Sequence, residues 1–226
     1  MRFYMKKIIL ATLVAAATCS SYAAETTQLK VQGKLVAAAC TPSLSDGGAV
    51  DFGDISVSAL SATEVNQMGD KHITLTIECD SATKVGFTNE DTRKDTDPNI
   101  SVKFDNGVVL GNPGNIFGLG QTAEGVGIGS YGIRVDSNNV TADGITTPII
   151  YQQKDHAAGA GWTASAGTLQ DSDFRTITVG DPTTPKAFIT GVFPMTVAAA
   201  IQPTETLSLT DETALDGEMT FSLVYL

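Results

Sequence analysis

Residues 33–40 read GKLVAAAC and residues 72–79 read HITLTIEC. Each segment alternates apolar with polar or small residues and ends in a cysteine, a pattern typical of a β-strand. Ile73, Leu75 and Ile77 lie two residues apart and therefore share one face of the second strand. The two segments predict the first long strand of a β-sandwich and a partner strand.

The cysteines that end these segments are predicted to form a disulfide bond. Cys40 and Cys79 are the two cysteines outside the predicted leader, and an even number behind an export signal favours a disulfide. Closing a loop of about 40 residues contributes roughly 4 kcal/mol in the chain-entropy model. Two buried thiols are the alternative, and a metal site has less support because the cysteines and histidines show no ligand spacing.

Residues 1–23 are predicted to be a secretory signal peptide. Residues 2–7 carry basic side chains, residues 8–17 form an apolar run, and residues 21–23 form a small-x-small cleavage site. The apolar run is too short to span a bilayer, and no later segment is long and apolar enough to do so. A buried N-terminal helix and lipid attachment at Cys19 are less well supported alternatives.

The composition indicates one acidic domain. The 226-residue chain has a formal net charge of −11, and removal of the leader makes it more acidic. This balance argues against nucleic acid or anionic lipid as a partner, since both need a basic surface. The length remaining after the leader suits one sizeable core.

The rest of the chain predicts short strands joined by turns and long loops. Strands are predicted at residues 49–53, 85–88, 100–104, 131–135, 145–152, 176–179, 186–197 and 218–226. Turns are predicted at residues 41–43 and 46–48, and long loops at residues 89–99, 107–129 and 154–173. With no helix longer than a turn or two and no βαβ pattern, the fold class is all-β, a single antiparallel sandwich.

No residue pattern predicts catalysis, a cofactor or a metal. His72 lies on the outward side of its strand and His156 lies in a loop, so both are interpreted as solvated side chains, and no serine has the context of a nucleophile elbow. Residues 125–129 read GVGIG, but no helix follows to bind a dinucleotide. Residues 95–99 have the acidic spacing of a calcium loop, but the glycine and glutamate that this loop needs do not follow. The protein is therefore predicted not to be an enzyme.

The last predicted strand is strongly amphipathic and ends at the C-terminus. Met219, Phe221, Leu223 and Tyr225 share one face, and one residue, Leu226, follows. An ordinary core strand that happens to be terminal is the alternative interpretation.

Together these features resemble a chaperone–usher fimbrial subunit. The resemblance rests on the signal peptide, a short extension, residues 33–42 (GKLVAAACTP), residues 50–55 (VDFGDI), residues 73–80 (ITLTIECD) and the penultimate Tyr225. Residues 125–136 are similar to the middle strand of that family. The resemblance is dense over residues 28–88 and clear again over residues 217–226.

The resemblance implies an immunoglobulin-like sandwich that lacks its final strand. A periplasmic chaperone fills the resulting groove first, and the N-terminal extension of the next subunit replaces it at an outer-membrane usher, a form of β-strand addition. On this chain the extension is residues 24–32, which precede the domain at 33–226, and Leu29 and Val31 are its inserted side chains. Met219, Phe221, Leu223 and Tyr225 border the groove, and the Leu226 carboxylate meets basic residues of the chaperone. The implied location is the cell surface, reached through the periplasm.

Two departures from the family pattern favour a minor or fimbrial-like subunit. Thr213 stands where the family places a glycine, and the nearest glycine is Gly217. The extension carries two large apolar side chains rather than the four or five of a major subunit. A host glycan or surface receptor stays open as a partner. The alternatives are an exported, non-polymerising sandwich that binds carbohydrate near Tyr151 and Trp162, and a secreted hydrolase.

Overall fold

A computed structural model describes residues 27–34, 39–153, 161–170, 174–207, 209 and 212–226. The chain divides into two units, residues 1–36 and residues 37–226. In the first unit, the described residues 27–34 have no regular secondary structure. The side chains of Leu29 and Val31 in that unit are 88% and 90% exposed.

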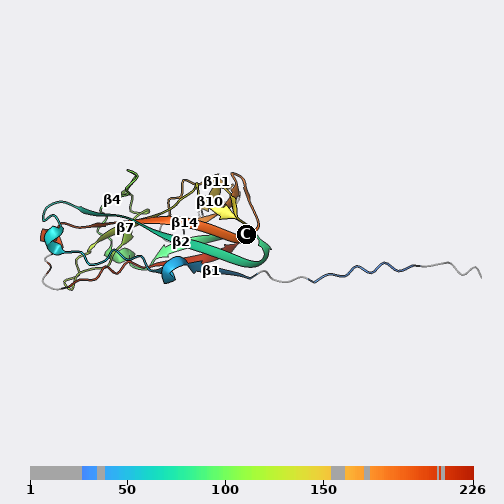
Figure 1. Cartoon of the computed structure of the whole chain (residues 1–226), viewed down its shortest axis with the longest axis horizontal. Coiled ribbons are helices and arrows are strands. Elements are labelled where there is room, and N and C mark those ends of the chain that lie inside the picture. The colour runs from blue at the N-terminus through green and yellow to red at the C-terminus, as the bar shows by residue number, and fades with distance from the viewer. Residues whose placement is uncertain (1–26, 35–38, 154–160, 171–173, 208, 210–211) are drawn as a thin grey trace, which may run out of the picture. The chain divides into compact units, whose positions relative to one another are not determined.

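The second unit consists of two antiparallel sheets, which confirms the predicted all-β sandwich (Figure 1). The first sheet has the order β1 (Cys40–Leu44), β2 (Asn66–Thr83), β14 (Phe188–Ile201), β7 (Gly129–Val135) and β6 (Phe117–Gly118). In addition, β8 (Thr141–Ala142) pairs with β14, and β9 (Ile145–Thr146) pairs with β8. The second sheet has the order β11 (Thr163–Ala164), β10 (Ile149–Gln153), β12 (Arg175–Asp181), β3 (Val85–Asp91) and β15 (Met219–Tyr225), with β13 (Thr184–Pro185) beside β12.

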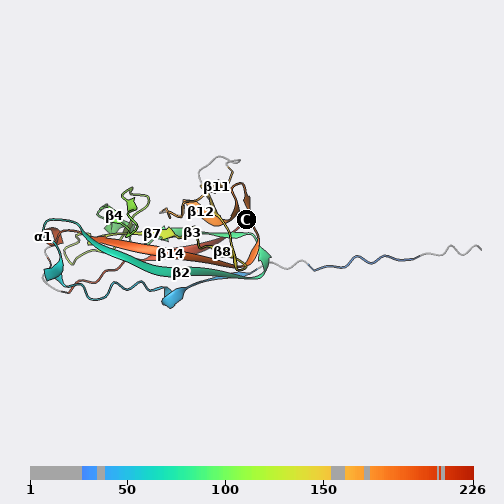
Figure 2. The same cartoon turned by 45° about the horizontal axis from the view of Figure 1, so that its top comes forward.

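A small hairpin covers part of the first sheet. It consists of β4 (Val102–Lys103) and β5 (Val109–Leu110), and Figure 2 shows β4 beside β7 and β14. Phe104 and Leu110 of this hairpin region pack against Ala198 and Ala200 of β14 in a second, smaller apolar cluster. The described helices are short: η1 (Ser45–Gly48), η2 (Val57–Ala59), η3 (Lys94–Thr96) and α1 (Thr204–Leu207). None of the helices in the described residues is long and apolar enough to cross a membrane.

The main core lies between the two sheets. In the middle of β2, every second side chain points into it. Ile73, Leu75 and Ile77 are all buried, as their shared face predicts. From the second sheet, Phe87 of β3 is fully buried, and its ring lies edge-on to Phe193 of β14 with centroids 5.2 Å apart. The two sheets are therefore held together by large apolar side chains from strands distant in sequence.

The first predicted strand is displaced along the chain. Gly33, Lys34 and Ala39 are not in a strand, residues 35–38 lie outside the described residues, and β1 begins at Cys40. It then continues through Thr41–Ser43, where the sequence predicts a turn, so that prediction is wrong. Pro42 is tolerated because β1 is an edge strand, where a missing backbone donor costs little.

A second correction concerns residues 49–53, predicted as a strand. This segment has no regular secondary structure, although Val50 and Phe52 pack against the main core. Gly48 and Gly53 on either side of these residues adopt positive φ angles of 84° and 70°, which interrupt an extended strand. Val50 and Phe52 therefore alternate because both side chains pack against the core, although no strand pairs with this segment.

Most of the remaining strand predictions agree with the structure in position, but the segment predicted at 100–104 is a strand only at Val102–Lys103. β3, β7, β12 and β14 include the segments predicted at 85–88, 131–135, 176–179 and most of 186–197. The segment at 145–152 is broken at Pro148 into β9 and β10, as proline in a strand predicts. The long loops contain further two-residue strands such as β5 and β6, which are too short to give a periodic signal.

We expect Asp143, at the turn between β8 and β9, to make stability depend on pH. Its Oδ1 accepts hydrogen bonds from the backbone N–H groups of Thr190 (2.9 Å) and Ile189 (2.8 Å), and these bonds lower the pKa of the carboxyl. A lowered pKa stabilises the fold above the ordinary aspartate pKa, and this contribution is lost as the pH falls through the lowered value.

Asp143→Asn is the matched variant, because asparagine also tolerates the positive φ of 55° and keeps an acceptor oxygen. The melting temperature of the wild type should exceed that of Asp143→Asn at neutral pH, and the gap should close below the ordinary aspartate pKa. Asp143→Ala should be less stable than Asp143→Asn at every pH. Parallel melting curves for the wild type and Asp143→Asn across acid pH would contradict the assignment.

Candidate functional site

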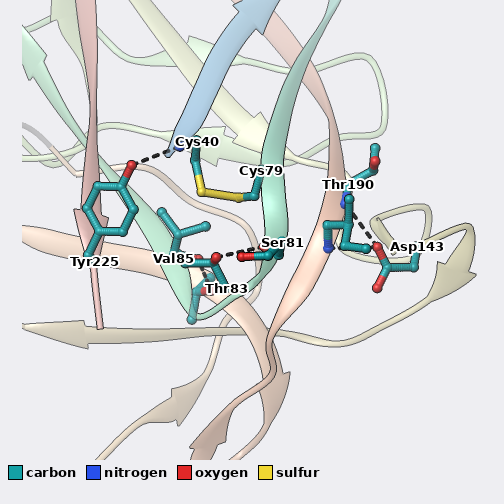
Figure 3. The surroundings of a disulfide bond; sticks show 10 residues. Cys40, Cys79, Ser81, Thr83, Val85, Asp143, Thr190 and Tyr225 are labelled. Carbon is teal, nitrogen blue, oxygen red and sulfur yellow. Dashed lines mark hydrogen bonds between the residues drawn. A yellow bond between two sulfur atoms is a disulfide. The ribbon is translucent and has the colours of Figure 1, made fainter. Parts of the chain in front are cut away.

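The disulfide predicted between Cys40 and Cys79 is present and joins β1 to β2 (Figure 3). The two cysteines are directly opposite each other in the antiparallel register of these strands. Cys79 is buried, and Cys40 is half-buried beside the main core. The bond therefore holds the start of the edge strand against the centre of the first sheet.

The two sheets expose one open edge each on the same side of the sandwich. Among the described strands, β1 pairs with β2 alone and β15 pairs with β3 alone. Along one side of each strand, the backbone N–H and C=O groups therefore form no hydrogen bonds to another strand of the described residues.

At one end, the two open edges are joined through Tyr225. The backbone N–H of Cys40 donates a hydrogen bond of 2.9 Å to the Tyr225 hydroxyl (Figure 3). The next residue, Leu226, donates its backbone N–H to the Lys84 carbonyl at 3.0 Å. These bonds fix the end of β15 beside the disulfide, so the open edges meet there.

Beyond this junction an apolar groove of about 150 Å³ lies between β15 and the segment from Leu44, the last residue of β1, to Phe52. Its walls include Leu44, which ends β1, and Met219 and Phe221 of β15. Ile73, Ile133 and Val197 from the first sheet also line it. Met219, Phe221 and Leu223 are only half-buried, whereas the partner strand β3 is buried along most of its length. The core is thus incompletely covered along β15.

A wider cavity of about 570 Å³ lies next to the groove. Val50, Phe52 and Leu215 line both spaces, so the groove and the cavity adjoin. Gly217 lies at the groove where a Cβ atom would come within 2.9 Å of the Tyr131 ring, which explains why a glycine is needed there. Arg93 forms an ion pair of 2.7 Å with Asp216 and so holds the segment that leads into β15.

The structure brings together part of the predicted site. Met219 and Phe221 line the groove, Leu223 packs against the core, and Tyr225 bonds to Cys40. Leu226 is 44% exposed. Leu29 and Val31 belong to the first unit, and their role as inserted side chains stays a prediction.

Sequence reasoning missed the opposite wall of the groove. Leu44, Val50 and Phe52 line it, and Leu119 and Tyr131 complete it. The alternation of Val50 and Phe52 was the available signal, because it marks one apolar face next to the first strand. Nothing in the local sequence of Leu119 or Tyr131 indicates that they reach an incompletely covered region.

The other candidate motifs have structural explanations. His72 is exposed, with its Nδ1 3.3 Å from the Thr196 hydroxyl, whereas His156 lies outside the described residues.

Gly129 begins β7 where a Cβ atom would collide with the Ala200 carbonyl, so close approach of two strands explains a glycine of the GVGIG segment. Asp97 accepts hydrogen bonds from the Asn99 N–H and the Ser130 hydroxyl. Within the described ranges, no group of three or more histidine, cysteine, aspartate or glutamate residues could hold a metal ion.

The aromatic residues considered for carbohydrate binding lie at the other edge of the second sheet. The Arg175 guanidinium stacks on the Tyr151 ring at 4.1 Å from its centroid, and burial lowers the pKa of Arg175. Trp162 is half-buried next to β11. The Tyr151 ring is therefore already occupied on one face.

Comparison with known proteins gives relatives that extend over nearly the whole chain. Residues 29–132 match the family described as "Protein of unknown function (DUF1120)". The chain is 35% identical to "Uncharacterized protein YhcF" of Escherichia coli (strain K12) over 224 residues, which cover 92% of this chain and 93% of that protein. It is 29% identical to "Protein GltF" of the same organism over 254 residues, covering 99% of this chain and 100% of that protein.

Proposed function

We propose that this chain, which belongs to the same family as YhcF of Escherichia coli, is a structural subunit of a cell-surface fimbria. In this proposal the subunit is assembled by donor-strand exchange through a periplasmic chaperone and an outer-membrane usher, and it has no catalytic activity. A minor or fimbrial-like position in the fibre suits the short extension.

The observation that carries the proposal is the apolar groove along β15, whose opposite wall is the end of β1 and the segment that follows it. β15 leaves one backbone edge unpaired by the described strands, and its side chains Met219, Phe221 and Leu223 are half-buried. An added strand would pair with such an edge and cover the apolar floor at the same time. These are the two requirements of β-strand addition.

The occupant proposed for the groove is the extension of a neighbouring subunit, residues 24–32. Leu29 and Val31 are exposed, and in an inserted strand they would share one side while Lys30 between them would face outward. Burying two such side chains contributes roughly 3–6 kcal/mol. The backbone hydrogen bonds to β15 add to this and set the register.

The test compares three forms of a synthetic peptide spanning residues 24–34, added to the mature chain lacking residues 24–32. The natural peptide should raise the melting temperature of the shortened chain, because it completes the core. A Leu29→Ser, Val31→Ser peptide should lose this effect, whereas a Lys30→Thr control should keep it. Cells producing the chain without residues 24–32 should accumulate it bound to chaperone, with no incorporation into fibres.

The proposal fails if none of the three peptides changes the melting temperature and the deletion leaves fibre assembly unchanged. A peptide effect that survives Leu29→Ser, Val31→Ser would contradict the role of these two side chains.

A further inference from the structure

A polar hollow of about 400 Å³ lies on the first sheet and shares no lining residue with the groove. This volume falls within the range of roughly 300–1,000 Å³ of small-molecule sites. Arg134 of β7 and Thr196 of β14 line it, and their chain neighbours Ile133, Val135, Met195 and Val197 belong to the core. The hollow is therefore on the face of the sheet that points away from the core.

Arg134 is held in place at this hollow. Its Nη2 donates a hydrogen bond of 3.1 Å to the Ala166 carbonyl, and its guanidinium carbon lies 5.9 Å from the centre of the Phe104 ring. Its Nε is buried and has no hydrogen-bond partner among the described residues. A guanidinium fixed in this way loses little further freedom on binding a ligand.

Arg134 forms no ion pair with Asp136, the acidic residue that also lines the hollow. The Asp136 carboxylate accepts hydrogen bonds from the Asn138 backbone N–H (3.2 Å) and the Asn139 side-chain amide (2.6 Å). Among the described residues, the ion pairs involve Arg93 and not Arg134. A basic group that faces a concave surface is thus available in a chain of net charge −11.

Neutral polar side chains also line the hollow, together with Asp136, Val108 and Val135. Thr196 is directly opposite Arg134 in the strand register, and the loop residues Asn106, Ser137 and Asn138 contribute amide and hydroxyl groups. Each of these groups can both donate and accept hydrogen bonds, as sugar hydroxyls require. The Phe104 ring is buried beneath the hollow and supports the Arg134 side chain.

We propose that this hollow binds an acidic saccharide, with the carboxylate on Arg134 and the hydroxyl groups on Thr196 and Asn138. Guanidinium groups recognise carboxylates by charge-assisted hydrogen bonds, and the remaining side chains suit several hydroxyls on one ring. This binding activity goes beyond a structural role in a fibre and does not depend on it. It also differs in location from the loops around Trp162.

The test measures binding of D-glucuronate, D-glucose and acetate to the mature chain by NMR titration. Glucuronate should bind more tightly than either of the other two, because it alone offers both a carboxylate and ring hydroxyls. Arg134→Gln should weaken glucuronate binding at least tenfold, in keeping with a hydrogen bond between charged groups. Lys103→Gln is the matched control, since it removes an exposed charge from neighbouring β4 and should leave the affinity unchanged.

Two further variants keep the test decisive if Arg134→Gln does not fold correctly. Asn138→Ala changes an exposed loop side chain, and Thr196→Val keeps a β-branched residue in β14; each should weaken glucuronate binding severalfold with an unchanged melting temperature. The proposal is overturned if glucuronate does not bind, if acetate binds equally well, or if Asn138→Ala and Thr196→Val both bind as tightly as the wild type. Equal loss of affinity in Lys103→Gln would also overturn it, because the effect would then reflect overall charge.

Discussion

Replacing Cys40 and Cys79 together by serine lowers the free energy of unfolding by about 4 kcal/mol, the value for a closed loop of this length in the chain-entropy model. The bond links residues separated by 39 positions and fastens edge strand β1 to central strand β2. Without it, the unfolded chain gains conformational freedom, and β1 keeps its backbone pairing with β2, the bond to Tyr225 and the packing of Leu44. Urea unfolding of the double variant, followed by tryptophan fluorescence, measures the change.

The matched control is the wild-type chain unfolded in the presence of a reductant. Its midpoint should move to that of the double variant, whereas the double variant itself should not respond to the reductant. Identical midpoints for the oxidised wild type and the double variant would show that the bond adds no stability.

Phe87→Ala should cost about 3–5 kcal/mol of stability, as is usual for removal of a fully buried aromatic side chain. Phe87 is 0% exposed at the centre of β3, and its ring contacts Phe193 at 5.2 Å and Phe221 at 5.9 Å between centroids. Alanine leaves a cavity between the two sheets, and its cost adds to the lost burial of the ring. Denaturant unfolding at constant pH measures the loss.

Phe221→Ala provides the comparison, because Phe221 is an aromatic neighbour that lines the groove and is only half-buried. Its loss should cost the isolated chain clearly less than Phe87→Ala, since part of its surface already faces solvent. It should nevertheless reduce the stabilisation by the peptide of residues 24–34. Equal costs for the two variants would mean that the region along β15 is as fully covered as the centre of the core.

Much of the fold could be predicted from the sequence because the central strands have regular alternation. The pattern of β2 identifies its buried face residue by residue, and the cysteines identify its disulfide partner. The C-terminal alternation likewise places Met219 and Phe221 on the side that lines the groove. In each case the local period follows directly from the pleat of a strand.

The other parts of the fold and of the site could not be predicted, because they depend on contacts between residues distant in sequence. Pro42 suggests a turn, but its place at a sheet edge makes it compatible with β1. Val50 and Phe52 alternate like a strand, but no strand pairs with them and they line the groove instead. The hollow at Arg134 was not predicted, because it combines β7, β14 and the β4–β5 hairpin, which come together only through tertiary packing.

The hydrogen bond between Tyr225 and Cys40 has a consequence for the order in which the domain can be completed. The two residues are separated by 185 positions, and they lie on the edge strands of the two different sheets. A contact between residues so distant in sequence forms late, because a large part of the chain must first be ordered. This end of the sandwich can therefore close only after both sheets have their edge strands in place, and loss of the Tyr225 hydroxyl removes this bond between β1 and β15.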